Sequence, residues 1–404
     1  MPLSASQDRS RGSAAAVAVV FASAGFVMAQ TLARVPALRD QVGASQAELG
    51  LALVGGGLGS LLAMPYAARL VRRFGNRSVT ATAVVLGSLG WGSLALAGDV
   101  RVLFVLFVLA GAAVGVWDVS MNIQGYAVEQ RRGRSLMPVL HASFSAGAVV
   151  GAGAGALAAW LGVGLQQVVA GALVALATGV LGSRRFVPAE DADPGTSRDG
   201  AGDGRRRGIT RAEVLIGVVC LGAALAEGAA NDWLALLLVD VRNAPEAFGA
   251  LTFTAFNVTM LVGRLSGAPA IDRYGRTAVV RTGGVLAVTG ILLVTLVPSL
   301  VVALAGGLLW GLGVATVFPA AMSAAGDVPG RGAAAIGVVS TISYGAFLFG
   351  APTIGLLAES HGLDRALWLV VAFLVLMVLL AGRLREPTRS AGEPLGEVED
   401  PVGS

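Results

Sequence analysis

Residues 117–147 read WDVSMNIQGYAVEQRRGRSLMPVLHASFSAG. They begin inside an apolar run that carries Asp118, Asn122 and Gln124, cross a short loop rich in arginine, and enter a second apolar run that carries His141. An ionisable group at membrane depth is costly, so it is expected to face a water-filled cavity and to work there. The stretch therefore predicts two membrane-spanning helices that line an aqueous passage, which is typical of a transporter.

The composition supports a membrane protein and excludes several other classes. Hydrophobic residues make up 55% of the 404 residues, charged residues only 13%, and the mean hydropathy is +0.75. A soluble domain averages about 25% charged residues, so this chain has too little polar surface to cover itself. All 29 basic residues are arginine, which excludes a P-loop because that motif requires lysine. We expect a polytopic membrane protein.

The reactive residue types are too few for a metal or catalytic centre. One cysteine and two histidines cannot assemble a disulfide framework or a Cys/His metal site. No nucleophile–base arrangement is apparent either. We therefore predict no enzyme activity, no catalytic residues, no metal and no cofactor. The net charge of +4 does not indicate a nucleic-acid partner, because the positions of the arginines explain it better.

Apolar runs of about 20 residues recur along the chain and are too long for barrel strands, so we expect them to be transmembrane helices. The first run could be a signal peptide, but it continues to Pro36 without a break, and we favour a retained helix. The predicted fold is an all-α membrane protein with twelve transmembrane helices, at residues 14–36, 46–68, 78–98, 102–127, 136–161, 164–182, 213–239, 248–269, 282–298, 300–325, 333–358 and 366–383.

The arginines lie mainly in alternate loops. With the N-terminus placed inside, 23 arginines lie on the cytoplasmic side and four in the outside loops, while Arg34 and Arg264 lie within spans. Cytoplasmic loops carry an excess of positive charge. The bias predicts a multi-pass protein of the plasma or inner membrane with both termini cytoplasmic, surrounded by the lipid bilayer.

The two halves of the chain resemble each other. RRFGNR (72–77) follows the second span and DRYGRT (272–277) follows the eighth, which places Gly75 and Gly275 200 positions apart. AELG (47–50) and EAFG (246–249) repeat at nearly the same offset. We expect an N-terminal six-helix bundle over residues 1–182, a polar cytoplasmic linker over 183–212, a C-terminal six-helix bundle over 213–385, and a disordered cytoplasmic tail over 386–404.

This organisation resembles the major facilitator superfamily (MFS) of transporters over essentially the whole chain. Gly263 and Arg264, followed by DRYGR (272–276), are similar to the superfamily's cytoplasmic loop signature. The resemblance implies two parallel six-helix repeats with a site at midplane, and a gating role for Asp272, Arg273 and Arg276. The first-half copy departs from the signature because Arg72 stands where the acidic residue is usual, so the acid of a latch between neighbouring helices is missing there.

A narrower resemblance is to the MosC-like group, which includes the rhizopine-cluster membrane protein. The matching segments are RVPALRD (34–40), DVSMNIQ (118–124), Pro138 with HASFS (141–145), and Glu227-Gly228 with Asp232-Trp233. The subgroup implies a polar, sugar- or polyol-like solute.

Asp118 and Asn122 lie four residues apart and share a helix face. The superfamily resemblance implies that this fourth helix lines the central cavity. Asp118 lies about 16 residues into its span, on the order of 24 Å along the axis, and His141 has a similar depth on the next helix, so a hydrogen bond between them is feasible. We favour Asp118 and His141 as a proton-coupling pair, and the alternative is a structural pair that holds two helices together.

Further polar residues within spans are candidate solute contacts. Glu227 and Asn231 form a matching pair four residues apart on the seventh helix. With Asn122 and Gln124 they are the residues predicted to contact a polar solute.

Arg34 lies in the first helix, at a depth comparable to Asp232 on the seventh. An unpaired arginine there would be costly. We expect Arg34 to pair with Glu227 or Asp232 across the pseudo-two-fold axis and to help close the outward gate. The alternative is that its side chain extends to the headgroups.

Tryptophans and glycine-rich segments complete the candidate residues. Trp117, Trp233 and Trp310 lie on presumed cavity helices, and sugar rings stack on indoles, although membrane tryptophans are more often packing residues. We include Trp117 and Trp233 among the candidate solute contacts and expect Trp91 to pack. The glycines of 55–57 and 151–155 lie within apolar runs, which favours close helix packing over phosphate binding.

The sequence thus predicts a monomeric secondary transporter, driven by protons, that moves a small polar solute by alternating access. The first alternative is a proton-driven drug or metabolite exporter of the same superfamily. A remote alternative is a membrane receptor or scaffold that does not transport.

Overall fold

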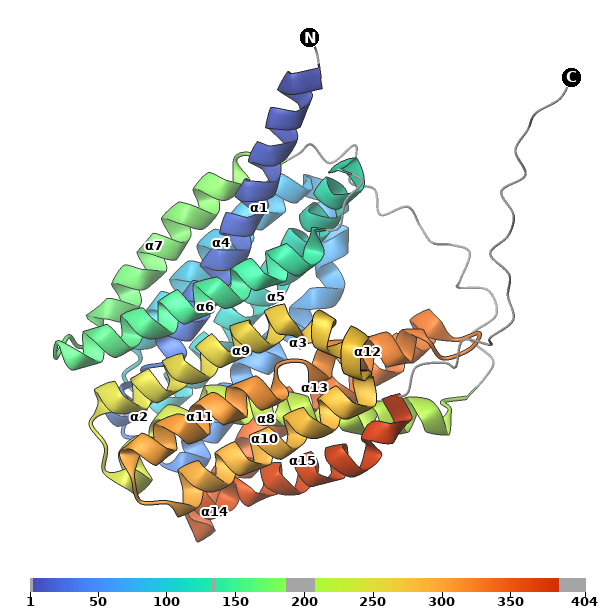
Figure 1. The fold of residues 1–404 in the computed structure, drawn as a ribbon. Coiled ribbons are helices and arrows are strands. Elements are labelled where there is room, and N and C mark those ends of the chain that lie inside the picture. The colour runs from blue at the N-terminus through green and yellow to red at the C-terminus, as the bar shows by residue number, and fades with distance from the viewer. Residues whose placement is uncertain (1–2, 133–135, 187–207, 385–404) are drawn as a thin grey trace, which may run out of the picture.

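The computed structural model of the chain describes residues 3–132, 136–186 and 208–384 (Figure 1). The described residues form helices and connecting turns, without strands. The helices of the first half are α1 (Leu3–Leu32), α2 (Val35–Val42), α3 (Gln46–Phe74), α4 (Asn76–Ser93), α5 (Val100–Arg132), α6 (Met137–Trp160) and α7 (Gln166–Ser183). Those of the second half are α8 (Arg211–Arg242), α9 (Glu246–Tyr274), α10 (Arg276–Leu296), α11 (Leu300–Val314), α12 (Val317–Gly326), α13 (Gly332–His361), α14 (Leu363–Ala366) and α15 (Trp368–Leu380).

Twelve helical segments are long and apolar enough to cross a membrane, which confirms the predicted number of spans. Leu300–Gly326 combines α11 and α12 into one span, and Leu363–Leu384 combines α14, α15 and a short 3₁₀ turn. Helix α2 is too short to span. Residues 187–207 of the predicted linker and all of the predicted tail, residues 386–404, lie outside the described residues.

The spans form two six-helix bundles. In the first bundle α1 packs on α6 and α7, and α5 packs on α3 and α4; in the second, α8 packs on α13 and α15, and α11 packs on α9 and α10. The bundles meet where α6 lies against α9 and α3 against α13, with α1 and α2 touching α8 (Figure 1). The loops richest in arginine gather at one end, here named the arginine-rich end, and the other is named the opposite end.

The predicted internal repeat has the same backbone geometry in both halves. Gly75 ends α3 with φ 79° and ψ 145°, and Gly275 ends α9 with φ 77° and ψ 154°. Positive φ is accessible to glycine at little cost, so each glycine lets its chain turn directly into the next helix. The two loops are therefore equivalent in conformation as well as in sequence.

Close packing explains the glycine-rich segments. A Cβ at Gly151 would meet the backbone oxygen of Phe26 at 2.3 Å, so α6 lies directly against α1. Across the bundles, a Cβ at Gly50 would meet the backbone oxygen of Ala351 at 2.6 Å, so α3 approaches α13 equally closely. Small residues allow such approach between membrane helices, and the expectation of packing rather than phosphate binding agrees with these contacts.

Candidate functional site

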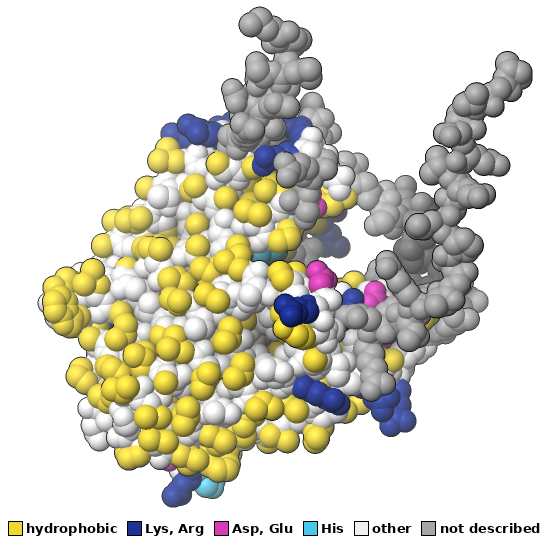
Figure 2. Space-filling model, viewed as in Figure 1, with side chains coloured by type: hydrophobic (Ala, Val, Ile, Leu, Met, Phe, Trp, Pro, Cys, Tyr) yellow, Lys and Arg dark blue, Asp and Glu magenta, His cyan; other side chains and the backbone are white. Residues whose placement is uncertain are grey.

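Two cavities adjoin between the bundles. The larger, of about 250 Å³, is lined by residues of α1, α3, α4, α5, α8 and α13. The smaller, of about 70 Å³, is lined by residues of α1, α6, α8 and α9. Met28, Leu32 and Asn231 line both, so the two cavities form one central region. Figure 2 shows the surface hollowed between the bundles, with charged side chains at the edge of the hollow.

An arginine in the central region binds to both bundles. Arg264 on α9 donates from one terminal nitrogen to Glu227 on α8 at 2.9 Å, and from the other to the hydroxyl of Ser145 on α6 at 3.1 Å. Each side chain of the ion pair keeps about 30% of its surface accessible. Asn257 and Asn231 line the same small cavity. The smaller cavity is thus lined by one positive charge, one negative charge and two amide groups, all of which can bind a polar solute.

Asp118 and His141 lie near this region but do not form the hydrogen bond that the sequence made feasible. Among the described residues, the carboxylate of Asp118 accepts from the Asn122 side chain at 3.3 Å. The His141 ring instead packs edge-on against Phe21, with ring centroids 5.5 Å apart. His141 lies within electrostatic range of Arg264, and Asp118 lies within range of Tyr344 on α13. The two groups therefore face different partners.

Gln124 does not reach the cavity, contrary to the expectation of a solute contact. Its side chain is completely buried and accepts a hydrogen bond from the Asn76 amide on α4 at 2.9 Å. Gln124 lies two positions after Asn122, which is about 200° around a helix, so the two amides point to opposite sides. The residue joins α5 to α4 inside the first bundle.

The predicted tryptophan contacts are also corrected. Trp117 and Trp233 have no accessible surface and line neither cavity, and Trp310 is equally buried against Phe256. Trp117 fills the space above Gly87, where a Cβ would lie 3.0 Å from the indole ring. The larger cavity is instead lined by Trp91, which the sequence indicated as a packing residue.

Arg34 pairs across the bundles, but with a different partner from those expected. Its Nε donates to Glu246 at the start of α9 at 2.6 Å, and a terminal nitrogen donates to the backbone oxygen of Val163 at 3.0 Å. Only 3% of its surface is accessible, so it does not extend to the headgroups. Glu227 pairs with Arg264 instead, and Asp232 lines the larger cavity.

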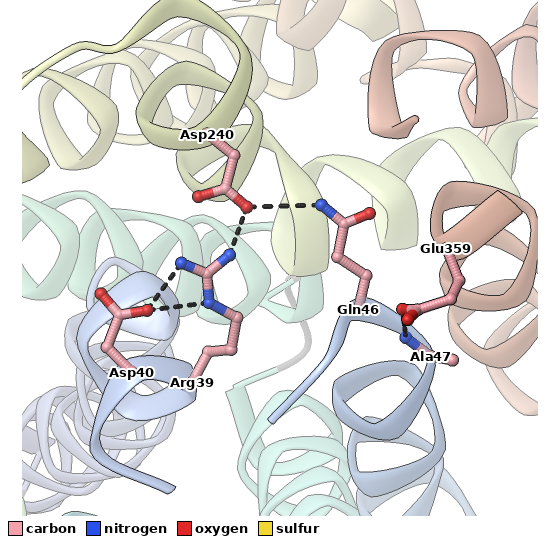
Figure 3. Close-up of polar contacts among 6 residues, drawn as sticks. All are labelled: Arg39, Asp40, Gln46, Ala47, Asp240 and Glu359. Carbon is pink, nitrogen blue, oxygen red and sulfur yellow. Dashed lines mark hydrogen bonds and ion pairs between the residues drawn. The ribbon is translucent and has the colours of Figure 1, made fainter. Parts of the chain in front are cut away.

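A second set of polar contacts between the bundles lies at the opposite end, like the Arg34 pair (Figure 3). Arg39 on α2 pairs with Asp240 on α8 and, within its own bundle, with Asp40 at 2.6 Å. The amide of Gln46 also donates to Asp240, at 3.4 Å. Burial lowers the pKa of the Arg39 guanidinium, but its hydrogen bonds to Asp240 and Asp40 outweigh this effect and leave the pKa raised. Arg39 therefore stays charged.

The start of α3 completes this closed end. The backbone N–H of Ala47 donates to Glu359 on α13 at 3.3 Å (Figure 3). A carboxylate near a helix N-terminus interacts favourably with the helix dipole. Three carboxylates of the second bundle, those of Glu246, Asp240 and Glu359, thus accept four hydrogen bonds from the first bundle at the opposite end.

The loop residues predicted to gate lie at the arginine-rich end, beside residues of the second bundle. Arg276 pairs with Asp327 at the end of α12, Arg273 lies over the Tyr274 ring at 5.3 Å, and Asp272 is exposed. Nearby, Arg331 donates to the buried Glu213 at 2.5 Å. Their part in gating stays a prediction.

Several residues of the site were missed from the sequence. Arg264 was noted as an arginine within a span and as part of the loop signature but not as a site residue, although an intramembrane arginine is itself a functional signal. Asp240, Glu246 and Glu359 lie near span ends, where a charge has no distinguishing pattern, so no sequence signal could have found them.

The twelve candidate membrane spans and the cavities between the two bundles are typical of a membrane transporter. The family model described as Major Facilitator Superfamily matches residues 15–245 and 219–403, and the chain belongs to that superfamily. The chain is accordingly a multi-pass membrane transporter and not an enzyme.

Two relatives span nearly the whole chain. An uncharacterized MFS-type transporter of Yersinia pestis is 31% identical over 369 residues, covering 90% of this chain and 94% of that protein. The membrane protein MosC of Rhizobium meliloti is 30% identical over 362 residues, covering 88% of this chain and 86% of that protein. The resemblance to the MosC-like group is therefore confirmed.

Solved structures confirm the fold. The crystal structure of nucleoside transporter NupG superposes with a TM-score of 0.71 at 15% identity, covering 93% of this chain and 98% of that one. That of D-xylose-proton symporter gives a TM-score of 0.72 at 13% identity, covering 92% and 96%.

Proposed function

We propose that the chain is a proton-coupled transporter of a small polar solute, working by alternating access as a monomer in the plasma or inner membrane with both termini cytoplasmic. The solute class follows from the resemblance, which implies a sugar- or polyol-like molecule, and from the polar groups around the smaller cavity. Among proteins of the same fold, one is a nucleoside transporter and one a D-xylose-proton symporter.

The observation that carries the proposal is the Glu227–Arg264 ion pair in the central region. An ion pair is costly to place at membrane depth because both charges lose their hydration, and it is stable there only if the charges compensate one another. Ionised residues within spans therefore usually mark a functional site. Arg264 also donates to Ser145 on the other bundle, so the same guanidinium contacts both halves of the molecule. A solute that binds here, with Asn231 and Asn257 beside it, touches elements that move relative to each other when a transporter changes state.

Asp118 is the proposed proton-coupling group. It lies on a membrane-spanning helix, its described hydrogen bond comes from a neutral amide, and it forms no ion pair with a described arginine. Such a carboxylate gains most from taking up a proton when the surroundings dry. His141 does not contact Asp118 and lies near Arg264 instead. Its part is therefore separate from that of Asp118.

Alternating access requires that one end closes while the other is open. The pairs Arg34–Glu246 and Arg39–Asp240 join the bundles at the opposite end. With the arginine-rich end placed in the cytoplasm, as we propose, this arrangement corresponds to an inward-facing state. The pairs must break to give the outward-facing state.

Uptake into proteoliposomes tests the function. Protein reconstituted with an imposed pH gradient is assayed with labelled sugars, polyols and nucleosides, and native protein is compared with Asp118→Asn. We expect gradient-driven accumulation to fall to the level of gradient-free exchange in the variant. Exchange without a gradient is the control, because it needs the solute site but no net proton movement. Equal gradient-driven accumulation would remove Asp118 from the coupling role.

The lining of the larger cavity favours a second candidate, a proton-driven exporter of a less polar molecule. Most of its wall is apolar, including Leu53, Leu61, Met64 and Val114. Overexpression separates the two: an exporter lowers the cellular content of its ligand, whereas an importer raises it.

A further inference from the structure

Among the described residues that line the larger cavity, Asp232 on α8 carries the one charge. The other described side chains of this lining are apolar or aromatic, apart from Ser60, Asn231 and Tyr344, which carry oxygen or amide groups. The cavity volume of about 250 Å³ is slightly below the range of roughly 300–1,000 Å³ typical of sites for drug-sized ligands. The space suits one small organic molecule.

The carboxylate of Asp232 has no compensating partner. The structure gives it no hydrogen bond or ion pair with any described residue, whereas Glu227, five positions earlier on the same helix, is paired with Arg264. An ionised carboxylate in a mainly apolar space is costly unless a cation or a proton joins it. A positively charged ligand or a proton in the cavity would therefore compensate the charge of Asp232.

The aromatic side chains that line the same cavity as Asp232 favour some cations over others. Trp91 and Phe107 form an edge-to-face pair with ring centroids 6.0 Å apart, and both line the cavity. Aromatic faces attract organic cations, particularly ammonium groups, when the site is shielded from water. A bare metal ion needs several oxygen ligands, and no group of three or more metal-ligating side chains occurs among the described residues. The aromatic and aliphatic walls fit a carbon-bearing cation better.

We propose that the larger cavity binds a small organic cation, a protonated amine whose charge pairs with Asp232 and whose carbon skeleton packs against Trp91 and Phe107. The inference rests on the proposed function, because it names the chemical class of the solute. A hydroxyl or a second polar group on the same molecule reaches Asn231, which borders the smaller cavity and its Glu227–Arg264 pair.

Binding to the purified full-length protein in detergent tests the proposal without any gradient. The probes are matched pairs in which an amine replaces a hydroxyl, cyclohexylamine against cyclohexanol and glucosamine against glucose, each titrated calorimetrically and by thermal unfolding. Potassium chloride replaces sodium chloride in a parallel series to detect a metal ion. We expect each amine to bind and stabilise the protein and its neutral counterpart to bind much more weakly.

Variants of the carboxylate separate a specific charge from a structural effect. Loss of one partner of a desolvated charge pair typically weakens binding by roughly thirtyfold or more, so Asp232→Asn should lower amine affinity by at least that factor. Asp232→Glu keeps the charge and should retain the preference for amines. Asp40→Asn, an equal loss of charge on an exposed part of α2, should leave amine affinity unchanged.

Several results of these binding experiments would contradict the proposal. Neutral and amine probes binding equally, full amine binding by Asp232→Asn, or no amine binding at millimolar concentration would each overturn the proposal. Stabilisation by sodium alone would assign the cavity to a metal ion instead. Gradient-driven uptake of a neutral sugar with no preference for amines would support the transport function and contradict this inference. Amine binding that is lost in Asp232→Asn would support the inference even if no gradient-driven uptake were found.

Discussion

Removing the carboxylate of Asp240 should shift the protein towards the state that is open at the opposite end. Asp240 accepts from Arg39 and from Gln46, so Asp240→Asn weakens two contacts between the bundles at once. The side chains of Arg39 and Asp240 are 16% and 20% accessible, which places the pair between a surface and a buried ion pair. Exposed pairs contribute roughly 0.2–1 kcal/mol, and breaking a buried pair costs roughly 3–5 kcal/mol.

We take about 1–2 kcal/mol for this intermediate case, which changes the ratio of open to closed molecules by about five- to thirtyfold. Pulsed electron paramagnetic resonance measures that ratio directly. Spin labels at Arg101→Cys and Arg365→Cys, both exposed near the opposite end of different bundles, report the separation of the bundles. The buried Cys220 is first replaced by alanine so that labelling is specific.

Asp40→Asn is the matched control, because Asp40 pairs with the same arginine from within the first bundle. It removes one negative charge beside Arg39 but leaves the cross-bundle contact in place. We expect a longer label separation in Asp240→Asn and little change in Asp40→Asn. An unchanged distance distribution in Asp240→Asn, or equal opening in both variants, would refute the gating role of this pair.

Three further changes test other contacts. Gly50→Val should favour the open state in the same distance measurement, because the new side chain meets an α13 carbonyl at 2.6 Å from its Cβ, whereas Gly98→Ala, which meets nothing within 4 Å, should not. Gln124→Leu should lower the thermal midpoint by leaving the buried Asn76 amide unpaired, at about 1–3 kcal/mol, while solute affinity in a binding assay stays unchanged. Arg34→Met should open the end further than Asp240→Asn does, since Arg34 is almost fully buried, and exchange of charges with its α9 partner should restore part of the closure.

The number and type of the elements could be predicted because the bilayer leaves few alternatives. A backbone in hydrocarbon must satisfy its own hydrogen bonds, so apolar runs of this length have to be helices. The repeat around Gly75 and Gly275 then indicated two equivalent bundles, and both glycines have the positive φ that such a turn needs. These conclusions depend on local sequence, and the structure confirms them.

Side-chain direction was predictable in principle where one helix carries several candidates. Successive residues are 100° apart on a helix, so a residue two positions from a cavity-facing one points away from the cavity. Trp233 follows the cavity-lining Asn231 by two positions and is fully buried. Gln124 is fully buried as well, against Asn76 of α4. Treating every polar or aromatic residue of a cavity helix as a contact ignored this geometry.

Pairing between helices was not predictable in the same way. That Arg34 has a partner followed from the cost of an unpaired buried charge, and its partner lies across the bundles as expected. The choice of Glu246 depends on how α1 and α9 tilt towards one another, which the repeat offset does not define. Arg264 shows the same limit, since its two partners come from α8 and α6.

The closed end has a consistent polarity that leads to a last prediction. The first bundle supplies the donors, Arg34, Arg39 and the start of α3, and the second supplies the carboxylates. Because Arg39 and Asp240 are partly exposed, 1 M salt, where the Debye length is about 3 Å, should weaken their attraction, while the buried Arg34 is screened much less. High salt should therefore raise the open population of native protein by a few-fold at most in the same label measurement. The salt effect should be much smaller in Asp240→Asn, because the partly exposed Arg39–Asp240 pair is already gone. If salt opened that variant as strongly as native protein, screening would act elsewhere and the assignment of the salt effect to this pair would be wrong.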